Sequence, residues 1–292
     1  MNTALKKKSL EESLSDHTSG TIESENGVEV VGDSILTNIY RGYTKWLEEC
    51  SRFGIPQYVL SKLIGEDIIT SEDITKVPSL LQAHTDHKHF RSSGNFLSAL
   101  IQRSYNHGFN NFELDLEDIY VNFDNRKNGL DFVGTTLKGT KDHPLSINVE
   151  GIRGGFGYAK NVRAIIKSCL GQSISIMGSF SEDSVFEIHG DSGYQLGDNA
   201  KRCHFEIYGN TGQQMGLMSE RCTFVLHGKI DTDFIPYIGR EAKDSVFKFY
   251  DETSAHIAIK SLNKEKPDNN SPRGISVYLV KSKGNEEKIF EI

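Results

Sequence analysis

Cysteine is scarce in this sequence, with four residues in a chain of 292. Cys50 and Cys169 have no cysteine near them in the sequence. Cys203 and Cys222 do not have the C-x-x-C spacing of a zinc ribbon or a redox site. We therefore expect reduced thiols, and the sequence indicates no cofactor.

Long apolar runs and a surplus of basic residues are also missing. No run of eighteen apolar residues occurs, so we expect no membrane span. The first residues, MNTALKKKSL, have lysines but no apolar stretch behind them, unlike a secretory signal. The net charge is -7 and the pI is about 5.8, whereas nucleic-acid binding needs a clustered basic face. We expect a cytoplasmic protein whose partners are neither nucleic acid nor membrane.

The first third of the chain is predicted to be a tail followed by helices. Residues 1–30 are rich in Ser, Glu and Lys and poor in aromatic residues, which predicts a disordered tail. Residues 31–108 are predicted to be helical because apolar side chains recur at helical spacing. The expected helices cover residues 35–50, 58–64, a segment from Ser71 that Pro78 interrupts, and 95–107.

Residues 109–262 show short β-type runs separated by glycines, and they contain an internal repeat. Gly171, Gly190, Gly209 and Gly228 are each nineteen residues apart. The last unit carries four extra residues, in KIDTDFIPYIG. With these allowed for, Phe186, Phe205, Phe224 and Phe247 align in one column, and Ile188, Ile207, Leu226 and Phe249 align two residues later. Positions two apart share one face of a strand. A short unit of this kind cannot bury its apolar face alone, so the repeat predicts stacked parallel strands, a β-solenoid.

Charged columns fit the same alignment. Glu182, Lys201, Glu220 and Lys243 alternate in sign, and Asp183, Arg202, Arg221 and Asp244 pair at both ends of their series. Such exposed pairs contribute only about 0.2–1 kcal/mol each. We therefore interpret them as evidence for the alignment of neighbouring units and not as the main source of stability.

The segments that follow the repeat are expected to extend and close the stack. The run SAHIAI after Asp251 is expected to add one more strand, and residues 263–292 to form a polar loop and a last strand, ISVYLV, with a charged tail. The ends of a solenoid expose strand edges. The helical third and the ISVYLV segment are the expected caps.

The repeated glycines resemble those of a known superfamily. The unit G-[DN]-x-G-x-x-x-G, followed by a strand of the F-x-I-x-G kind, is similar to the repeat of the GXGXG superfamily. The residues that carry this resemblance are Gly190, Asp191, Gly193, Gly197, Gly209, Asn210, Gly212, Gly216 and Gly228. The resemblance implies a right-handed parallel β-helix, as in the C-terminal domain of the large chain of glutamate synthase and in one component of formylmethanofuran dehydrogenase.

The resemblance implies a scaffold role or a role in contacts within a complex, because the chemistry of those families lies in other parts of their complexes. The fold class is then mainly β, a right-handed parallel β-helix of about nineteen-residue coils after a small helical region. We expect a non-catalytic scaffold or interaction module that binds a protein partner or itself. The alternatives are a subunit of a redox or amidotransfer complex like those of the superfamily, or a carbohydrate-active β-helix protein.

Four groups of residues are candidates for chemistry. His84, Asp86, His87 and His89 have ligand types suited to a divalent metal, but their spacing fixes no common geometry, so a polar linker is favoured. Asp191 and Asp198 could act on a glycan but are better explained as turn residues, since Asn210 takes the place of Asp191 in the next unit. Cys203 and Cys222 could form a disulfide or bind a soft metal, although packing as buried thiols is favoured. His189 and His227 share a column with Tyr208 and Tyr250, which suggests stacking.

Overall fold

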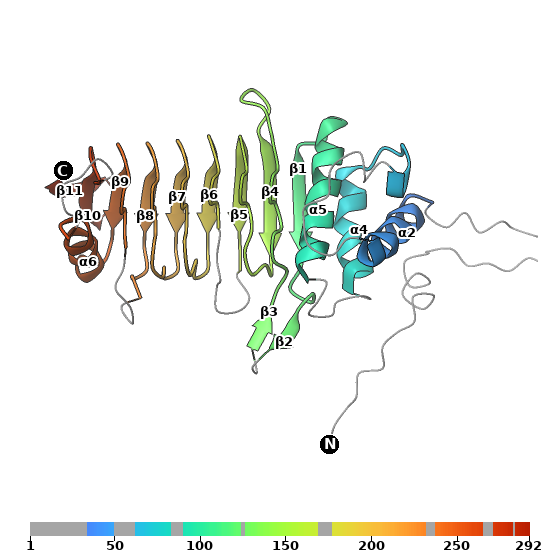
Figure 1. Cartoon of the computed structure of the whole chain (residues 1–292), viewed down its shortest axis with the longest axis horizontal. Coiled ribbons are helices and arrows are strands. Elements are labelled where there is room, and N and C mark those ends of the chain that lie inside the picture. Colours follow the sequence, from blue (N-terminus) through green and yellow to red (C-terminus); the bar gives the residue numbers. More distant parts are fainter. Residues whose placement is uncertain are drawn as a thin grey trace, which may run out of the picture.

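The structure is a computed structural model that describes residues 34–49, 62–82, 90–123, 126–168, 177–231, 237–264, 271–282 and 284–292. The expected tail over residues 1–30 lies outside these ranges, as does Gly171. The described elements form an elongated molecule in which strands stack side by side between helices at the two ends (Figure 1).

Three helices lie together at one end (Figure 1). They are α2 (Ser34–Glu49), α4 (Ser71–Gln82) and α5 (Phe90–Asn106). The apolar side chains that share one face of each helix are buried, among them Tyr43, Trp46 and Phe96. Residues 62–64 are helical and are followed by Gly65 with φ +73°. The rest of the helix expected over residues 58–64 lies outside the described residues.

The expected interruption of α4 at Pro78 is wrong, because the helix continues to Gln82. A proline inside a helix costs about 3 kcal/mol. Pro78 is buried together with Ile74, Val77 and Leu81. Each such apolar side chain contributes about 1.5–3 kcal/mol on burial, so the packing of α4 outweighs the local preference.

Nine strands form one open sheet, ordered β1-β4-β5-β6-β7-β8-β9-β10-β11. They are β1 (Asn111–Asp115), β4 (Leu145–Glu150), β5 (Val162–Ile166), β6 (Val185–Ile188), β7 (His204–Ile207), β8 (Thr223–Leu226), β9 (Val246–Phe249), β10 (Ser276–Ser282) and β11 (Asn285–Glu291). Neighbouring strands pair parallel except β10 and β11, which are antiparallel. A separate antiparallel pair joins β2 (Val121–Phe123) to β3 (Arg126–Asn128). The described part of the chain therefore combines one mostly parallel, nine-stranded sheet with a few helices, a mainly β or α/β architecture.

Strand pairing joins the residues that the nineteen-residue register aligns. Phe186 pairs with Phe205, Phe205 with Phe224, and Phe224 with Phe247. These rings are fully buried and stack with centroids 4.9–5.0 Å apart. The separation matches the spacing of neighbouring strands, about 4.8 Å. The rings are thus stacked by the backbone pairing itself.

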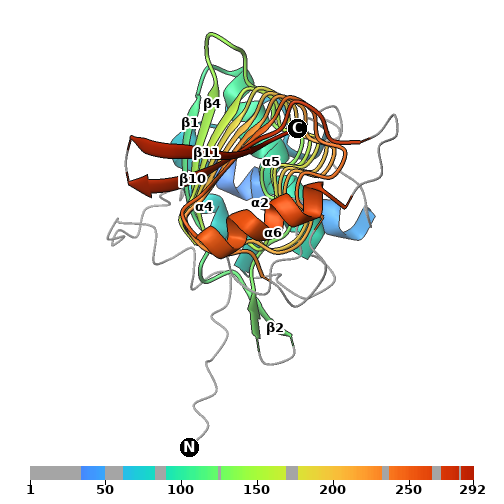
Figure 2. The ribbon, with the colours of Figure 1, turned by 90° about the vertical axis from the view of Figure 1, so that its left-hand side faces the viewer.

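A second line of pairing runs beside the strands. Glu182 makes a parallel bridge to Lys201, Lys201 to Glu220, and Glu220 to Lys243. The Nζ atom of Lys160 lies 3.1 Å from Oε2 of Glu182 in the same column. Viewed along the sheet, the segments that join successive strands overlie one another (Figure 2). Each unit therefore contacts the next along two separate lines.

Two glycine columns allow the units to approach this closely. Gly197 has φ +63°, and a Cβ atom there would lie 2.7 Å from the ring of Phe224 and 2.9 Å from that of Phe205. A Cβ atom on Gly209 would overlap the backbone of Gly190 in the preceding unit. Larger residues would push neighbouring units apart, which explains why these positions of the repeat hold glycine.

Side chains of helix α5 cover residues 132–138, the segment that precedes β4. Gln102 donates from Nε2 to the carbonyl of Lys138 (3.0 Å) and accepts from its amide N–H (2.6 Å). Ser98 Oγ donates to the carbonyl of Phe132 (3.1 Å) and accepts from the amide of Gly134 (2.8 Å). The helix thus satisfies backbone groups that would otherwise have no neighbouring unit to pair with.

The other end differs from the expectation. The SAHIAI segment, expected as a strand, belongs to helix α6 (Glu252–Leu262). Asp251 caps this helix, because its Oδ2 accepts from the amide of Ser254 at 2.8 Å. Ala255, Ala258 and Leu262 are buried at helical spacing, and this burial against the last unit favours the helix.

The charged tail after β10 is also ordered into a strand. It forms β11, in which Ile289 and Phe290 pack partly buried against the core. Helix α6 and the β10–β11 hairpin lie across the end of the stack (Figure 2). Within the described ranges, no helix is both long and apolar enough to cross a membrane.

Candidate functional site

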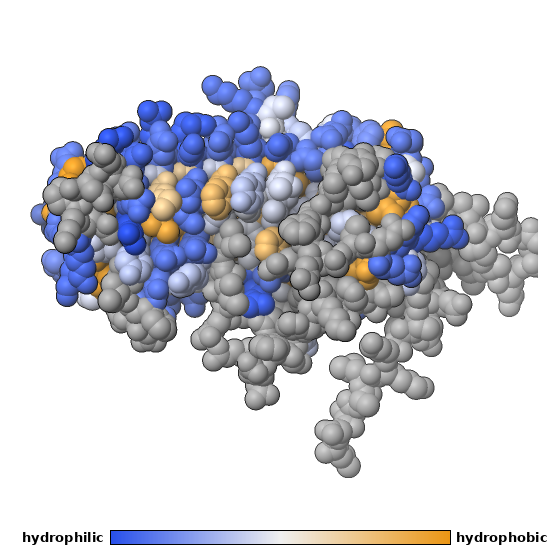
Figure 3. Space-filling view, viewed as in Figure 1, coloured by the Kyte–Doolittle hydropathy of each residue, from blue (hydrophilic) through white to orange (hydrophobic). Residues whose placement is uncertain are grey.

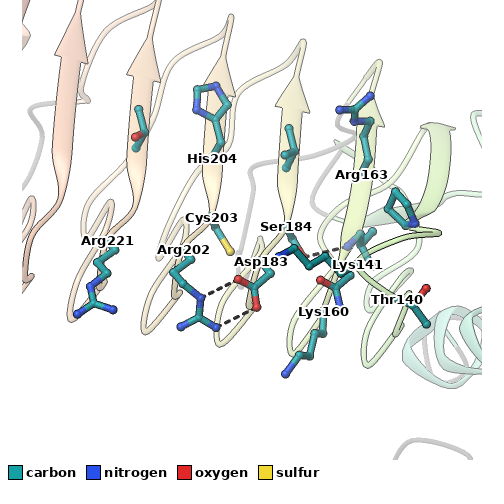
Figure 4. A pocket seen from close by; sticks show the side chains of 15 residues that line it. Thr140, Lys141, Lys160, Arg163, Asp183, Ser184, Arg202, Cys203, His204 and Arg221 are labelled. Carbon is teal, nitrogen blue, oxygen red and sulfur yellow. Dashed lines mark hydrogen bonds and ion pairs between the residues drawn. The ribbon is translucent and has the colours of Figure 1, made fainter.

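An open hollow of about 850 Å³ lies along one flank of the sheet. One wall is formed by the first residues of successive strands and the other by the turns that precede them. The strand wall includes Arg163, Val185, His204 and Thr223, and the turn wall includes Asp183, Arg202 and Arg221. Figure 4 shows Arg163 and His204 on the strand side and Arg202, Arg221 and Lys160 on the turn side.

The turn wall exists because each unit bends at a residue in the left-handed region. Asp183, Arg202 and Arg221 have φ of 51°, 52° and 53°. This conformation lets each amide reach the next unit: the amide of Asp183 donates to Lys201 (3.0 Å) and that of Arg202 donates to Glu220 (2.8 Å). Left-handed residues other than glycine cost about 1–2 kcal/mol each, and these hydrogen bonds help to offset that cost. The side chains are left on the flank, facing solvent.

The hollow is rich in positive charge although the chain is acidic. Arg202 donates from Nε and Nη2 to both carboxylate oxygens of Asp183, at 2.7 and 2.9 Å. This hydrogen-bonded pair, with the charges of Arg202, Lys160 and Lys141, holds the pKa of Asp183 below its ordinary value. Arg221 lies 4.0 Å from carboxylates of both Glu220 and Asp244. The ion pairs expected at the two ends of this column are therefore present, one close and one long.

Small polar side chains form the floor of the hollow and continue beyond it. Ser184, Cys203, Cys222 and Ser245 are buried in one column. The amide of Cys203 donates to Sγ of Cys222 (3.4 Å), and the amide of Cys222 donates to Oγ of Ser245 (3.1 Å). Both thiols are free. The hydrogen bond with Cys222 and burial raise the pKa of the Cys203 thiol, which disfavours the reactive thiolate.

A column of histidine and tyrosine rings stands on the same sheet, just after the strands. His189 stacks on Tyr208 (4.6 Å), Tyr208 on His227 (4.5 Å), and His227 on Tyr250 (4.2 Å). Burial raises the pKa of Tyr208, and the nearby charges of Glu206 and Glu187 raise it further. The rings stack on one another, as the sequence column suggested.

The carboxylates of Asp191 and Asp198 accept hydrogen bonds within and between the turns. Oδ1 of Asp191 accepts from the amide of Asn210 at 2.7 Å, and Oδ1 of Asn210 accepts from the amide of Lys229 at 2.9 Å. The same hydrogen bond therefore recurs one unit later with an amide in place of the carboxylate. Burial raises the pKa of Asp198, and hydrogen bonds from Asn199 partly oppose this.

The candidate metal ligands His84, Asp86, His87 and His89 lie outside the described residues. Among the residues that the structure does describe, no three His, Cys, Asp or Glu side chains come together as a metal-binding group.

Sequence reasoning missed the hollow. Arg202 and Arg221 were identified as a charged column, but Lys141 and Arg163 precede the strict repeat and carry no spacing signal. The position of Arg163 follows from the pairing of β5 with β6, which sets it opposite Val185 at a spacing of twenty-two residues.

No protein-family model, curated protein or solved structure matches this chain.

Proposed function

We propose that this chain is a right-handed parallel β-helix of the GXGXG kind that acts as a non-catalytic scaffold or protein-interaction module. The observation that carries the proposal is the double register of nineteen residues. Phe186 pairs with Phe205 while Glu182 pairs with Lys201, so two sides of each unit are displaced by the same step. Equal displacement on two sides supports a unit that is one turn of a coil.

The flanks offer the surfaces that such a module would use. Tyr158 and Phe180 are 55% and 42% exposed, and their rings stack at 4.8 Å. Met218 is 43% exposed, and like them it has a positive φ in the corresponding turn. Exposed apolar residues stand among polar ones over the stacked strands (Figure 3). Exposed apolar side chains that gather on one surface commonly mark protein contacts, which supports a protein as the partner.

The proposal is tested by comparing the full chain with a Tyr158→Ser/Phe180→Ser variant. We expect size-exclusion chromatography with light scattering to detect self-association, or affinity purification from the source cells to recover a partner. The double variant should weaken that association at least tenfold. Tyr250→Ser is the matched control, because Tyr250 is 41% exposed in the other ring column.

Two outcomes would contradict the proposal. One is a full chain that stays monomeric and retains no partner. The other is an association that the double variant and the Tyr250→Ser control weaken equally.

A further inference from the structure

The hollow on the flank is long enough for an extended segment of another chain. Its lining begins at Thr140, before β4, and reaches Thr223 on β8. Four strand spacings of about 4.8 Å give a length of about 19 Å. An extended peptide advances about 3.3 Å per residue, so roughly six residues fit along it.

The cations of the hollow differ in whether a nearby carboxylate neutralises them. Arg202 is held by Asp183, and Lys160 lies 3.1 Å from Glu182. The exposed side chain of Arg163 makes no ion pair with any residue that the structure describes. Arg221 is 61% exposed and its closest carboxylates are at 4.0 Å. Lys141 is exposed and contributes positive charge beside Asp183.

The cations stand on two walls, and this arrangement distinguishes between ligands. Arg163 is on the strand wall, whereas Arg221 is on the turn wall (Figure 4). Successive side chains of an extended peptide point to opposite sides, so acidic residues could reach both walls. The lining contains no Phe, Tyr or Trp among the described residues, whereas single-stranded nucleic acid is held by stacking on such rings.

We propose that this hollow binds an extended acidic segment of about six residues from a partner protein. The inference rests on the proposed function, because it names one site and one partner chemistry for the interaction module. The cations are spread over the length of the hollow and none is deeply buried, so a small anion would meet few of them at once. Affinity should come from several weak charge contacts and should decrease as salt rises.

The test uses the full chain and a fluorescein-labelled hexaglutamate peptide, followed by fluorescence anisotropy. Arg163→Glu/Arg221→Glu should weaken binding at least tenfold, and Arg163→Lys should retain most of it. Arg41→Glu/Lys264→Glu is the matched control: it makes the same change in net charge on exposed residues outside the hollow and should change the dissociation constant less than twofold. Thermal unfolding by circular dichroism verifies that each variant folds.

The inference is overturned if hexaglutamate does not bind, or if the two double variants weaken binding equally. It is also overturned if oligothymidylate or oligogalacturonate of matched charge binds as tightly as hexaglutamate, since the site would then not select a peptide.

The proposed function can fail separately. If the wild type and Arg163→Glu/Arg221→Glu retain a partner equally well, the proposed function as an interaction module is supported, but the hollow is not its binding site. If the chain binds hexaglutamate in the hollow but retains no partner and does not self-associate, the proposed function as an interaction module is contradicted.

Discussion

Phe205 lies in the middle of the stacked ring column, so its truncation measures what one buried ring of the column contributes to the free energy of unfolding. The ring is fully buried between Phe186 and Phe224. Phe205→Ala should lower the free energy of unfolding by about 3–5 kcal/mol, because it removes buried apolar surface and leaves a cavity. Denaturant unfolding followed by circular dichroism measures this loss.

Tyr208→Ala is the control for this change. Tyr208 follows the same strand but is 43% exposed, so its substitution should cost less than about 1 kcal/mol. Equal losses for the two variants would mean that the ring column is not the core.

The pair of Arg202 and Asp183 predicts a pH dependence of stability. The hydrogen bond from Arg202 lowers the pKa of Asp183 below its ordinary 3.8 in the folded chain. A lowered folded-state pKa stabilises the fold above pH 3.8, and the gain is lost as the pH falls through the folded-state value. Arg202→Gln should therefore cost about 0.2–1 kcal/mol at neutral pH and nothing in strong acid, since the pair is partly exposed.

Denaturant unfolding at a series of pH values tests this, with the Asp183 carboxyl followed by NMR. Arg221→Gln is the control and should show a smaller difference, because its guanidinium lies 4.0 Å from Asp244. A cost of Arg202→Gln that stays constant across the acid range would contradict the assignment.

Helix α5 acts as an edge cover, and Ser98 is the residue that tests it. Its buried hydroxyl donates a hydrogen bond to the carbonyl of Phe132 and accepts one from the amide of Gly134. Ser98→Ala should cost about 1–3 kcal/mol because the Gly134 amide loses its acceptor. Hydrogen exchange at Gly134 should become faster, as measured by NMR.

Ser79→Ala is the matched control, since Ser79 is an exposed helical serine whose Oγ donates to the carbonyl of Lys76. It should change stability by less than about 0.5 kcal/mol. Unchanged exchange at Gly134 in the Ser98→Ala variant would show that α5 does not protect this edge.

The elements differ in how far the sequence could predict them. β6 to β9 could be aligned because Phe186 and its equivalents must recur where the backbone pairs. α6 was missed because His256 to Ile259 alternate like a strand, while the burial that favours a helix comes from the last unit. The hollow was missed because Arg163 reaches it through strand pairing that no local pattern records.

At the scale of the whole molecule, a linear stack has two ends, and each must be covered. The C-terminal hairpin pairs β10 with β9, Ser276 opposite Val246 and Leu279 opposite Phe249. It also buries Ile275 and Val277 completely. Deleting residues 271–292 would therefore expose the backbone edge of β9 together with apolar core.

We expect this deletion to lower stability by several kcal/mol, at about 1.5–3 kcal/mol for each apolar side chain lost from the core. It should also produce association that rises with protein concentration beyond that of the full chain, measured by light scattering. Deleting residues 284–292 alone is the control: β10 still covers β9, so association should rise less. If both deletions associate like the full chain, β9 is protected by some other part of the molecule, and the hairpin is not the cover of this end.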